Sequence, residues 1–106
     1  MFVAMAMLVH PDLASVSLGA ALHALSDPVR LGMVARLAEA EQLNCGASAC
    51  PDMGVAKSTL SNHLAVLRAA GLVETVARGR EKVNTLRRAA FDRRFPGLLD
   101  AVLANR

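Results

Sequence analysis

The sequence lacks several features that mark other classes of protein. It has no uninterrupted apolar run long enough for a membrane-spanning helix, although 54% of its residues are apolar. The apolar opening, residues 1–9, has no lysine or arginine before it and no small-residue cleavage site after it, so a signal peptide is not expected. Two cysteines are too few for a disulfide framework. These absences predict a globular, cytoplasmic chain with no membrane partner.

The features of a catalytic site are also missing. No carboxylate pair accompanies a histidine, no glycine-rich phosphate loop follows a strand, and neither cysteine has an obvious base partner. A length of 106 residues is that of one ordinary domain with one hydrophobic core. Residues 1–106 are therefore predicted to form a single domain that is not an enzyme.

Positive charge is concentrated in the second half of the chain. Residues 1–56 contain two basic and five acidic side chains, whereas residues 57–94 contain nine basic and three acidic ones. A basic half beside an acidic half favours a polyanionic partner such as DNA, although ordinary solvated surface charge can produce the same division.

Helical patterns occupy most of the first half. Apolar residues at helical intervals predict a first helix over residues 12–25. A second helix is predicted to follow, with Ser26 or Asp27 as its cap and Pro28 in its first turn. Residues 44–56 are irregular, because Gly46, Pro51 and Gly54 interrupt any helix, and at most one short helix fits there.

Residues 57–73, KSTLSNHLAVLRAAGLV, predict a third helix with a distinctive outer face. Leu60, Leu64 and Leu67 form a buried stripe, and Gly71 ends the helix in a left-handed conformation. The residues opposite this stripe or on its flanks are small, uncharged and rich in hydrogen-bonding groups: Ser58, Thr59, Ser61, Asn62, Ala65 and Ala69. Such a face suits the major groove of DNA, although a solvated helix start with ordinary polar residues fits it as well.

Residues 72–86, LVETVARGREKVNTL, predict two short strands joined by a basic turn. Arg78 and Arg80 flank Gly79, and Lys82 follows on the second arm. A basic hairpin directly after a DNA-facing helix is typical of a winged helix-turn-helix, in which the hairpin contacts phosphates. An exposed turn charged only for solubility is the alternative. The predicted fold class is mainly α with a small β-hairpin.

Three segments in this order and spacing resemble the arsenic-repressor (ArsR/SmtB) family of bacterial transcriptional regulators: ALSDPVRLGMVARLAE, STLSNHLAVLRAAGLV and RGREKVNTLRR. The resemblance implies a homodimeric repressor that binds a palindromic double-stranded operator until an inducer releases it. It implies DNA contacts by Lys57, Ser58, Thr59, Ser61, Asn62, His63, Arg78, Arg80 and Lys82. His63, at the edge of the leucine stripe, is expected to pack within the protein more readily than to contact a base.

The family resemblance also implies dimerisation through the first and last helices, here by Leu13, Val16, Phe91, Phe95, Leu98, Leu99, Val102 and Leu103. Some of these residues could instead cover the core of the monomer. Many members of the family have a serine cap where this chain has Ala56. The third helix is therefore expected to begin less firmly, or to be capped by Ser58.

Cys45 and Cys50 are the candidate sensor. Counting back from SNHL, Cys45 falls on the first cysteine of the family's thiolate metal segment, Ala47 on the second and Cys50 on a further one. Thiolates would bind arsenite or a thiophilic metal, with His10 and Asp12 on an N-terminal arm as further ligands. The family's histidine and carboxylate site on the last helix is excluded, because no histidine follows His63.

Thiol oxidation is the rival role for this pair and is slightly favoured, because the middle thiolate is missing. The two cysteines could also be structural, with an organic inducer or none. The alternative function is then a winged-helix module that binds DNA constitutively or binds an acidic protein partner. Salt-sensitive binding with preference for a palindromic site would distinguish the repressor from this module.

Overall fold

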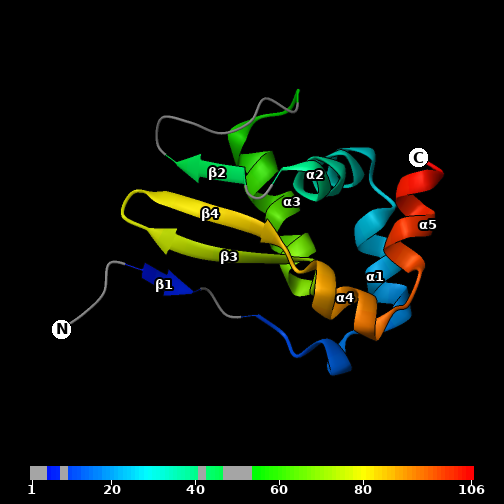
Figure 1. Ribbon diagram of the computed structural model, residues 1–106. Coiled ribbons are helices and arrows are strands. Elements are labelled where there is room, and N and C mark those ends of the chain that lie inside the picture. Colours follow the sequence, from blue (N-terminus) through cyan, green and yellow to red (C-terminus); the bar gives the residue numbers. More distant parts are fainter. Residues whose placement is uncertain (1–4, 8–9, 41–42, 47–53) are drawn as a thin grey trace.

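The structure is a computed structural model that describes residues 5–7, 10–40, 43–46 and 54–106 (Figure 1). Its helices and strands follow one another in the order β1 (Met5–Met7), the 3₁₀ helix η1 (Leu13–Ser15), α1 (Leu18–Leu25), α2 (Pro28–Glu39), β2 (Leu43–Gly46), α3 (Lys57–Ala69), β3 (Val73–Arg78), β4 (Glu81–Leu86), α4 (Arg88–Arg94) and α5 (Leu98–Ala104). No helix in these ranges is long and apolar enough to cross a membrane.

One antiparallel sheet lies beside a group of helices. Its strand order is β1-β3-β4-β2, so the β3–β4 hairpin forms the centre and the two shorter strands form the edges. Figure 1 shows the turn of the hairpin projecting away from α1, α4 and α5, which gather at the other end of the molecule. This confirms the predicted fold class of helices with a hairpin in a winged helix-turn-helix arrangement.

The cap and the leucine stripe predicted for the second and third helices are confirmed. Asp27 caps α2, because its Oδ2 accepts hydrogen bonds from the backbone N–H groups of Val29 and Arg30 at 2.9 and 3.0 Å. Leu60, Leu64 and Leu67 are the buried residues of α3. After α3, Gly71 has a φ of +78°, and the N–H of Leu72 donates to the carbonyl of Leu67. This is the Schellman arrangement that glycine permits.

The single helix predicted over residues 12–25 is wrong. The chain forms η1 and then α1, because Asp12 and Ser17 each cap a separate segment by accepting a backbone N–H bond, from Ala14 and Ala20 respectively. Between these two segments the backbone at Val16 is extended. Hydroxyl and carboxylate side chains that bond to the nearby backbone compete with continuous helix in this way.

The edge strands β1 and β2 were not predicted. β1 pairs with β3 from Met5 opposite Arg78 to Met7 opposite Val76. β2 pairs with β4 from Leu43 opposite Asn84 to Gly46 opposite Glu81, and its last three residues belong to the stretch 44–56 that was expected to be irregular. Cys45 is therefore part of a strand, and its backbone partner is Lys82. Cys50 lies outside the described residues.

Most of the residues predicted to form the dimer surface lie in the core of the monomer instead. Leu13, Val16, Phe91, Phe95 and Leu99 are all buried, and Phe91 and Leu99 are fully so. The physical reason is that α4 packs on both η1 and α5, and residues of all three elements complete the core. Leu98, Val102 and Leu103 are only partly buried against this core. The large apolar side chains that the described residues expose are Leu18 and Leu22 of α1, at 52% and 45%.

Candidate DNA-binding surface

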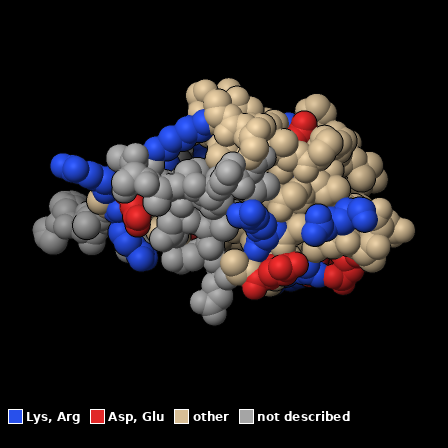
Figure 2. Space-filling view, turned by 90° about the horizontal axis from the view of Figure 1, so that it is seen from above, with Lys and Arg blue, Asp and Glu red and all other residues tan. Residues whose placement is uncertain are grey.

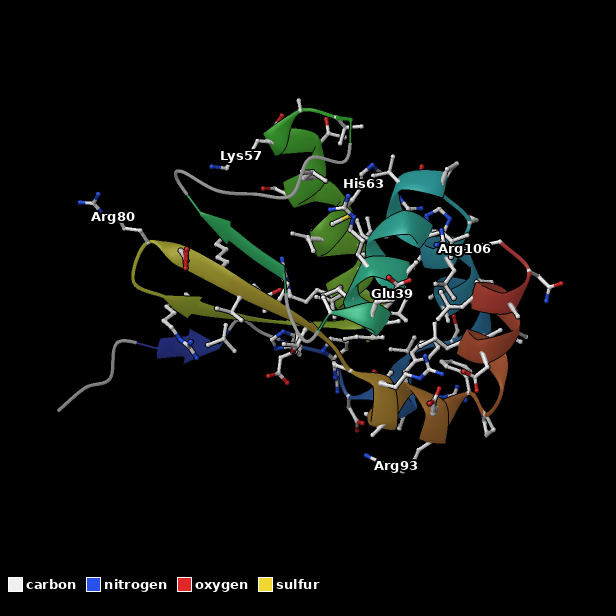
Figure 3. The ribbon with its side chains drawn as sticks, turned by 45° about the horizontal axis from the view of Figure 1, so that its top comes forward. Glu39, Lys57, His63, Arg80, Arg93 and Arg106 are labelled. Carbon is white, nitrogen blue, oxygen red and sulfur yellow. The ribbon has the colours of Figure 1, made fainter. Side chains whose placement is uncertain are left out.

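The first two turns of α3 present an exposed polar face. Lys57, Ser58, Ser61 and Asn62 are exposed, and Thr59 is half-buried. Figure 3 shows Lys57 at the N-terminal end of α3, on the outside of the molecule. The exposed side chains that follow Lys57 are short, so the backbone of DNA or the edge of a base can approach the helix closely.

The start of α3 has no side-chain cap. Ala56 occupies the cap position and makes no side-chain hydrogen bond, and Ser58 lies inside the helix. Of the two alternatives expected for this helix start, the cap by Ser58 is therefore not formed. The buried leucines and the Schellman end hold the orientation of α3, so its exposed N-terminal face rests on packing at the opposite side.

His63 faces the protein rather than the exposed face of α3. Its Nδ1 lies 3.3 Å from Nη1 of Arg30, and its Nε2 lies 3.8 Å from Oδ2 of Asp27. Because a guanidinium can only donate, Nδ1 accepts and the ring hydrogen is on Nε2. His63 thus joins α3 to the N-terminus of α2. Its ring packs within the protein, as expected, and not on the exposed face of the helix.

Arg30 is the centre of this connection between helices. Its buried side chain also donates to the carbonyls of Ala24 and His23, at 2.8 and 3.0 Å, at the end of α1. One guanidinium therefore ties together α1, α2 and α3. No local sequence signal marks this role, because Arg30 and His63 are 33 positions apart. The backbone bonds to Asp27, that to Arg30 above all, hold the pKa of its carboxyl below the usual value.

The hairpin turn is a second exposed basic feature. Arg78 opposite Glu81 is the last pair, so Gly79 and Arg80 form a two-residue turn. Gly79 has a φ of +61° and Arg80 a negative one, the arrangement of a type II′ turn. Arg78, Arg80 and Lys82 are exposed. Figure 2 shows basic side chains gathered around an acidic one at the left end of the molecule, where the hairpin lies.

A buried polar network fixes the base of the hairpin to α3. Oγ1 of Thr75 donates to Oδ1 of Asn84 at 2.8 Å and accepts from Nη1 of Arg68 at 3.2 Å. Thr75 and Asn84 are almost completely buried. Since buried hydrogen bonds of this kind are costly to break, the hairpin and α3 are expected to move together.

His10 and Asp12 do not form a free arm of metal ligands. Nε2 of His10 accepts the backbone N–H of Thr75 at 2.9 Å, which holds it against β3 of its own chain. Burial lowers the pKa of His10, in keeping with a neutral ring. Asp12 caps η1. Within the described ranges, no three His, Cys, Asp or Glu side chains form a group that could hold a metal ion.

Comparison with known proteins agrees with this arrangement. Residues 25–76, from the end of α1 into β3, match a family described as a helix-turn-helix domain. The chain is also similar to YceK, an uncharacterized HTH-type transcriptional regulator of Bacillus subtilis (strain 168). The two are 35% identical over 80 residues, which cover 74% of this chain and 79% of the relative.

Proposed function

The chain belongs to the helix-turn-helix transcriptional regulators, and we propose that it is a repressor of the ArsR/SmtB type that binds its operator as a homodimer. The observation that carries this proposal is the combination of an exposed polar α3 face with a basic hairpin turn fixed beside it. In the proposed complex, α3 enters the major groove and the hairpin contacts the neighbouring backbone. A regulator of this kind requires no catalytic group.

The proposed contacts divide between base edges and phosphates. Ser58, Ser61 and Asn62 are assigned to the major groove, because hydroxyl and amide groups on short side chains can approach base edges. Thr59 lies on the flank of the same face. Lys57, Arg78, Arg80 and Lys82 are assigned to phosphates, where positive charge contributes affinity without sequence preference. His63 is not included, since its ring is engaged with Arg30 and lies near Asp27.

The proposed dimer uses α1 and α5 with a changed set of residues. Leu18 and Leu22 are four positions apart and lie on one face of α1. Leu98, Val102 and Leu103 of α5 are partly buried and could complete this apolar surface. A two-fold dimer would place two α3 helices about one turn of DNA apart, which is why the proposed operator is palindromic.

The proposed sensor is the Cys45 and Cys50 pair, with thiol oxidation favoured over arsenite or metal. The backbone pairing of Cys45 with Lys82 supports this assignment, since a change at Cys45 would directly affect the residue of β4 that is a proposed phosphate contact. The bond from Thr75 to His10 weakens the case for a metal site, because it occupies one ring nitrogen that would otherwise bind metal.

Sequence recognition is tested by DNA binding. We expect the protein to prefer the DNA upstream of its own gene over a shuffled sequence, and Asn62→Ala to remove about 1–3 kcal/mol of that preference. Asn105→Ala, the same change near the C-terminus, is the control and should have no effect. Fluorescence anisotropy with both DNAs measures the difference. Equal weakening on both sequences would make Asn62 a contact without specificity.

Sensing is tested with the same DNA in three conditions. The protein is first reduced, then oxidised, and finally kept reduced while arsenite, cadmium or zinc is added. Release on oxidation that a dithiol reverses, and that Cys45→Ser or Cys50→Ser abolishes, is the expected result. Release by metal alone would replace the redox switch by a thiolate site. Release by neither would leave the DNA-binding proposal intact and remove the cysteines from it.

A further inference from the structure

An open hollow of about 400 Å³ lies between η1 and α4. Leu13, Ala14 and Ala90 form its apolar part, and Asp12, Arg87, Arg93 and Arg94 form its charged part. This volume is within the range of small-molecule sites, roughly 300–1,000 Å³, which combine an apolar lining with a few polar groups. Three guanidinium groups against one carboxylate give the hollow a positive charge, so its chemistry favours an anion.

Two of the three arginines are held in place by the backbone. Nη1 of Arg87 donates to the carbonyl of Pro11 at 3.2 Å. Arg94 donates from Nε to the carbonyl of Leu13 and from Nη2 to that of Val16, at 3.1 and 2.8 Å. Each guanidinium has five N–H donors, so both retain donors for a ligand. A side chain that is already ordered loses little further entropy when a ligand binds.

The third arginine has no acidic partner among the residues that the structure describes. Arg93 is exposed and makes no hydrogen bond or ion pair with any residue that the structure describes. Arg88 of the same helix differs, because it is paired with both Asp92 and Asp100. Arg93 therefore places an uncompensated positive charge on the wall of the hollow.

This charge is remote from the proposed DNA-binding surface. Figure 3 places Arg93 on the opposite side of the molecule from Lys57, and Arg80 at the tip of the hairpin. A flat approach of DNA to α3 and the hairpin would leave the hollow uncovered. Contact with the operator therefore does not account for the arginines of α4.

We propose that the hollow binds a small organic monoanion, with a single carboxylate and a short apolar body. The carboxylate would accept hydrogen bonds from Arg93 and from the remaining donors of Arg87 or Arg94. The apolar body would lie on Leu13, Ala14 and Ala90. Asp12 disfavours a second negative charge, which is why a monoanion fits better than a polyanion.

Such a ligand would lie against the base of the hairpin. The backbone N–H of Arg87 donates to the carbonyl of Leu72 at 2.8 Å, directly where β4 ends and β3 begins. The Arg87 side chain at the same time holds the segment that leads to His10. A ligand that engages Arg87 is therefore in contact with the residue that connects the N-terminal segment to the hairpin.

The test is an NMR titration of the full-length ¹⁵N-labelled protein with benzoate, benzamide and inorganic phosphate, in the absence of DNA. We expect benzoate to shift the amide signals of Ala14 and Ala90 and to bind about tenfold more weakly to Arg93→Gln, the loss of one charged hydrogen bond. Arg36→Gln removes an exposed arginine from α2 and should leave the affinity unchanged.

Four outcomes would overturn the assignment. Equal affinity for benzamide would exclude an anion site, and equal affinity for phosphate would exclude the contribution of the apolar lining. Benzoate shifts confined to α3, or none at millimolar concentration, would exclude the hollow as the binding site. Because no DNA is present, these results are independent of whether the protein is a repressor.

Discussion

Replacing Gly71 by alanine should destabilise the protein through two separable effects. With a φ of +78°, an L-residue pays about 1–2 kcal/mol for the left-handed backbone. The added Cβ would also meet Cδ2 of Leu13 at 2.2 Å and its Cγ at 3.0 Å, closer than such atoms approach. Leu13 is buried beside Val16 and has little room to turn away, so overpacking adds about 1–3 kcal/mol. The expected total is about 2–5 kcal/mol.

Gly97→Ala is the matched control for the backbone effect. Gly97 has the same φ of +78°, but nothing lies within 4 Å of an added Cβ. We expect it to cost only the backbone strain, about 1–2 kcal/mol. Alanine also lowers the conformational entropy of the unfolded chain relative to glycine. This contribution is common to both variants and cancels in their difference.

Urea unfolding followed by circular dichroism, with all variants at one protein concentration, measures these free energies of unfolding. A further variant isolates the clash, because Leu13→Ala removes the atoms that the new methyl group would meet. In that background, Gly71→Ala should cost no more than Gly97→Ala. If Gly71→Ala costs no more than Gly97→Ala in the normal background, then Leu13 does not oppose an added methyl group at position 71.

Three further outcomes are expected. Arg80→Ala should weaken binding to every DNA sequence and lower the slope of log affinity against log salt by about 0.9, whereas Arg36→Ala should not; an unchanged slope would exclude the hairpin turn. Leu18→Glu should shift the protein towards monomer in analytical ultracentrifugation, and Ala38→Glu, the same charge on exposed α2, should not. Asp27→Asn keeps a capping group but cannot titrate. The unsubstituted protein should therefore lose stability below pH 3.8 through this group, and the variant should not.

The sign of the last effect follows from the lowered pKa of Asp27. Its charged form is favoured in the folded state, so its stabilising contribution is fully present above the ordinary value of 3.8. That contribution is lost as the pH falls below 3.8 and through the lower folded pKa. Acid unfolding curves of the two proteins should therefore diverge only in this range, and parallel curves would contradict the role of the cap bonds.

The parts of the fold that the sequence predicted are those with a local signal. A cap and a proline marked the start of α2, leucine spacing and Gly71 marked α3, and Gly79 between β-branched arms marked the hairpin. The strands β1 and β2 had no such signal. They are three and four residues long, and their backbone partners lie more than 30 positions away in β3 and β4. Pairing of this kind depends on tertiary contacts rather than on local propensity.

The candidate site was predictable to a different degree. Helical periodicity identified which residues of α3 face outward, and the structure exposes all of them except Thr59, which is half-buried. Periodicity could not tell whether the apolar residues near the C-terminus cover the monomer or a partner, and Phe91, Phe95 and Leu99 turned out to be core. The hydrogen bonds of Arg30 and His10 to distant residues could not be predicted from periodicity either, since both join segments far apart in sequence.

The connections on either side of α3 indicate how an inducer signal would reach DNA. Through Arg30 and His63, α3 is joined to α2, and through Arg68 it is joined to the buried Thr75–Asn84 pair of the hairpin. β2 pairs with β4 along four residues, and Cys45 lies opposite Lys82. A change at Cys45 would thus reach the hairpin across a single backbone pair. From there the Thr75–Asn84 pair and Arg68 connect it to α3. The hairpin therefore offers a direct route from the proposed sensor to the proposed DNA contacts.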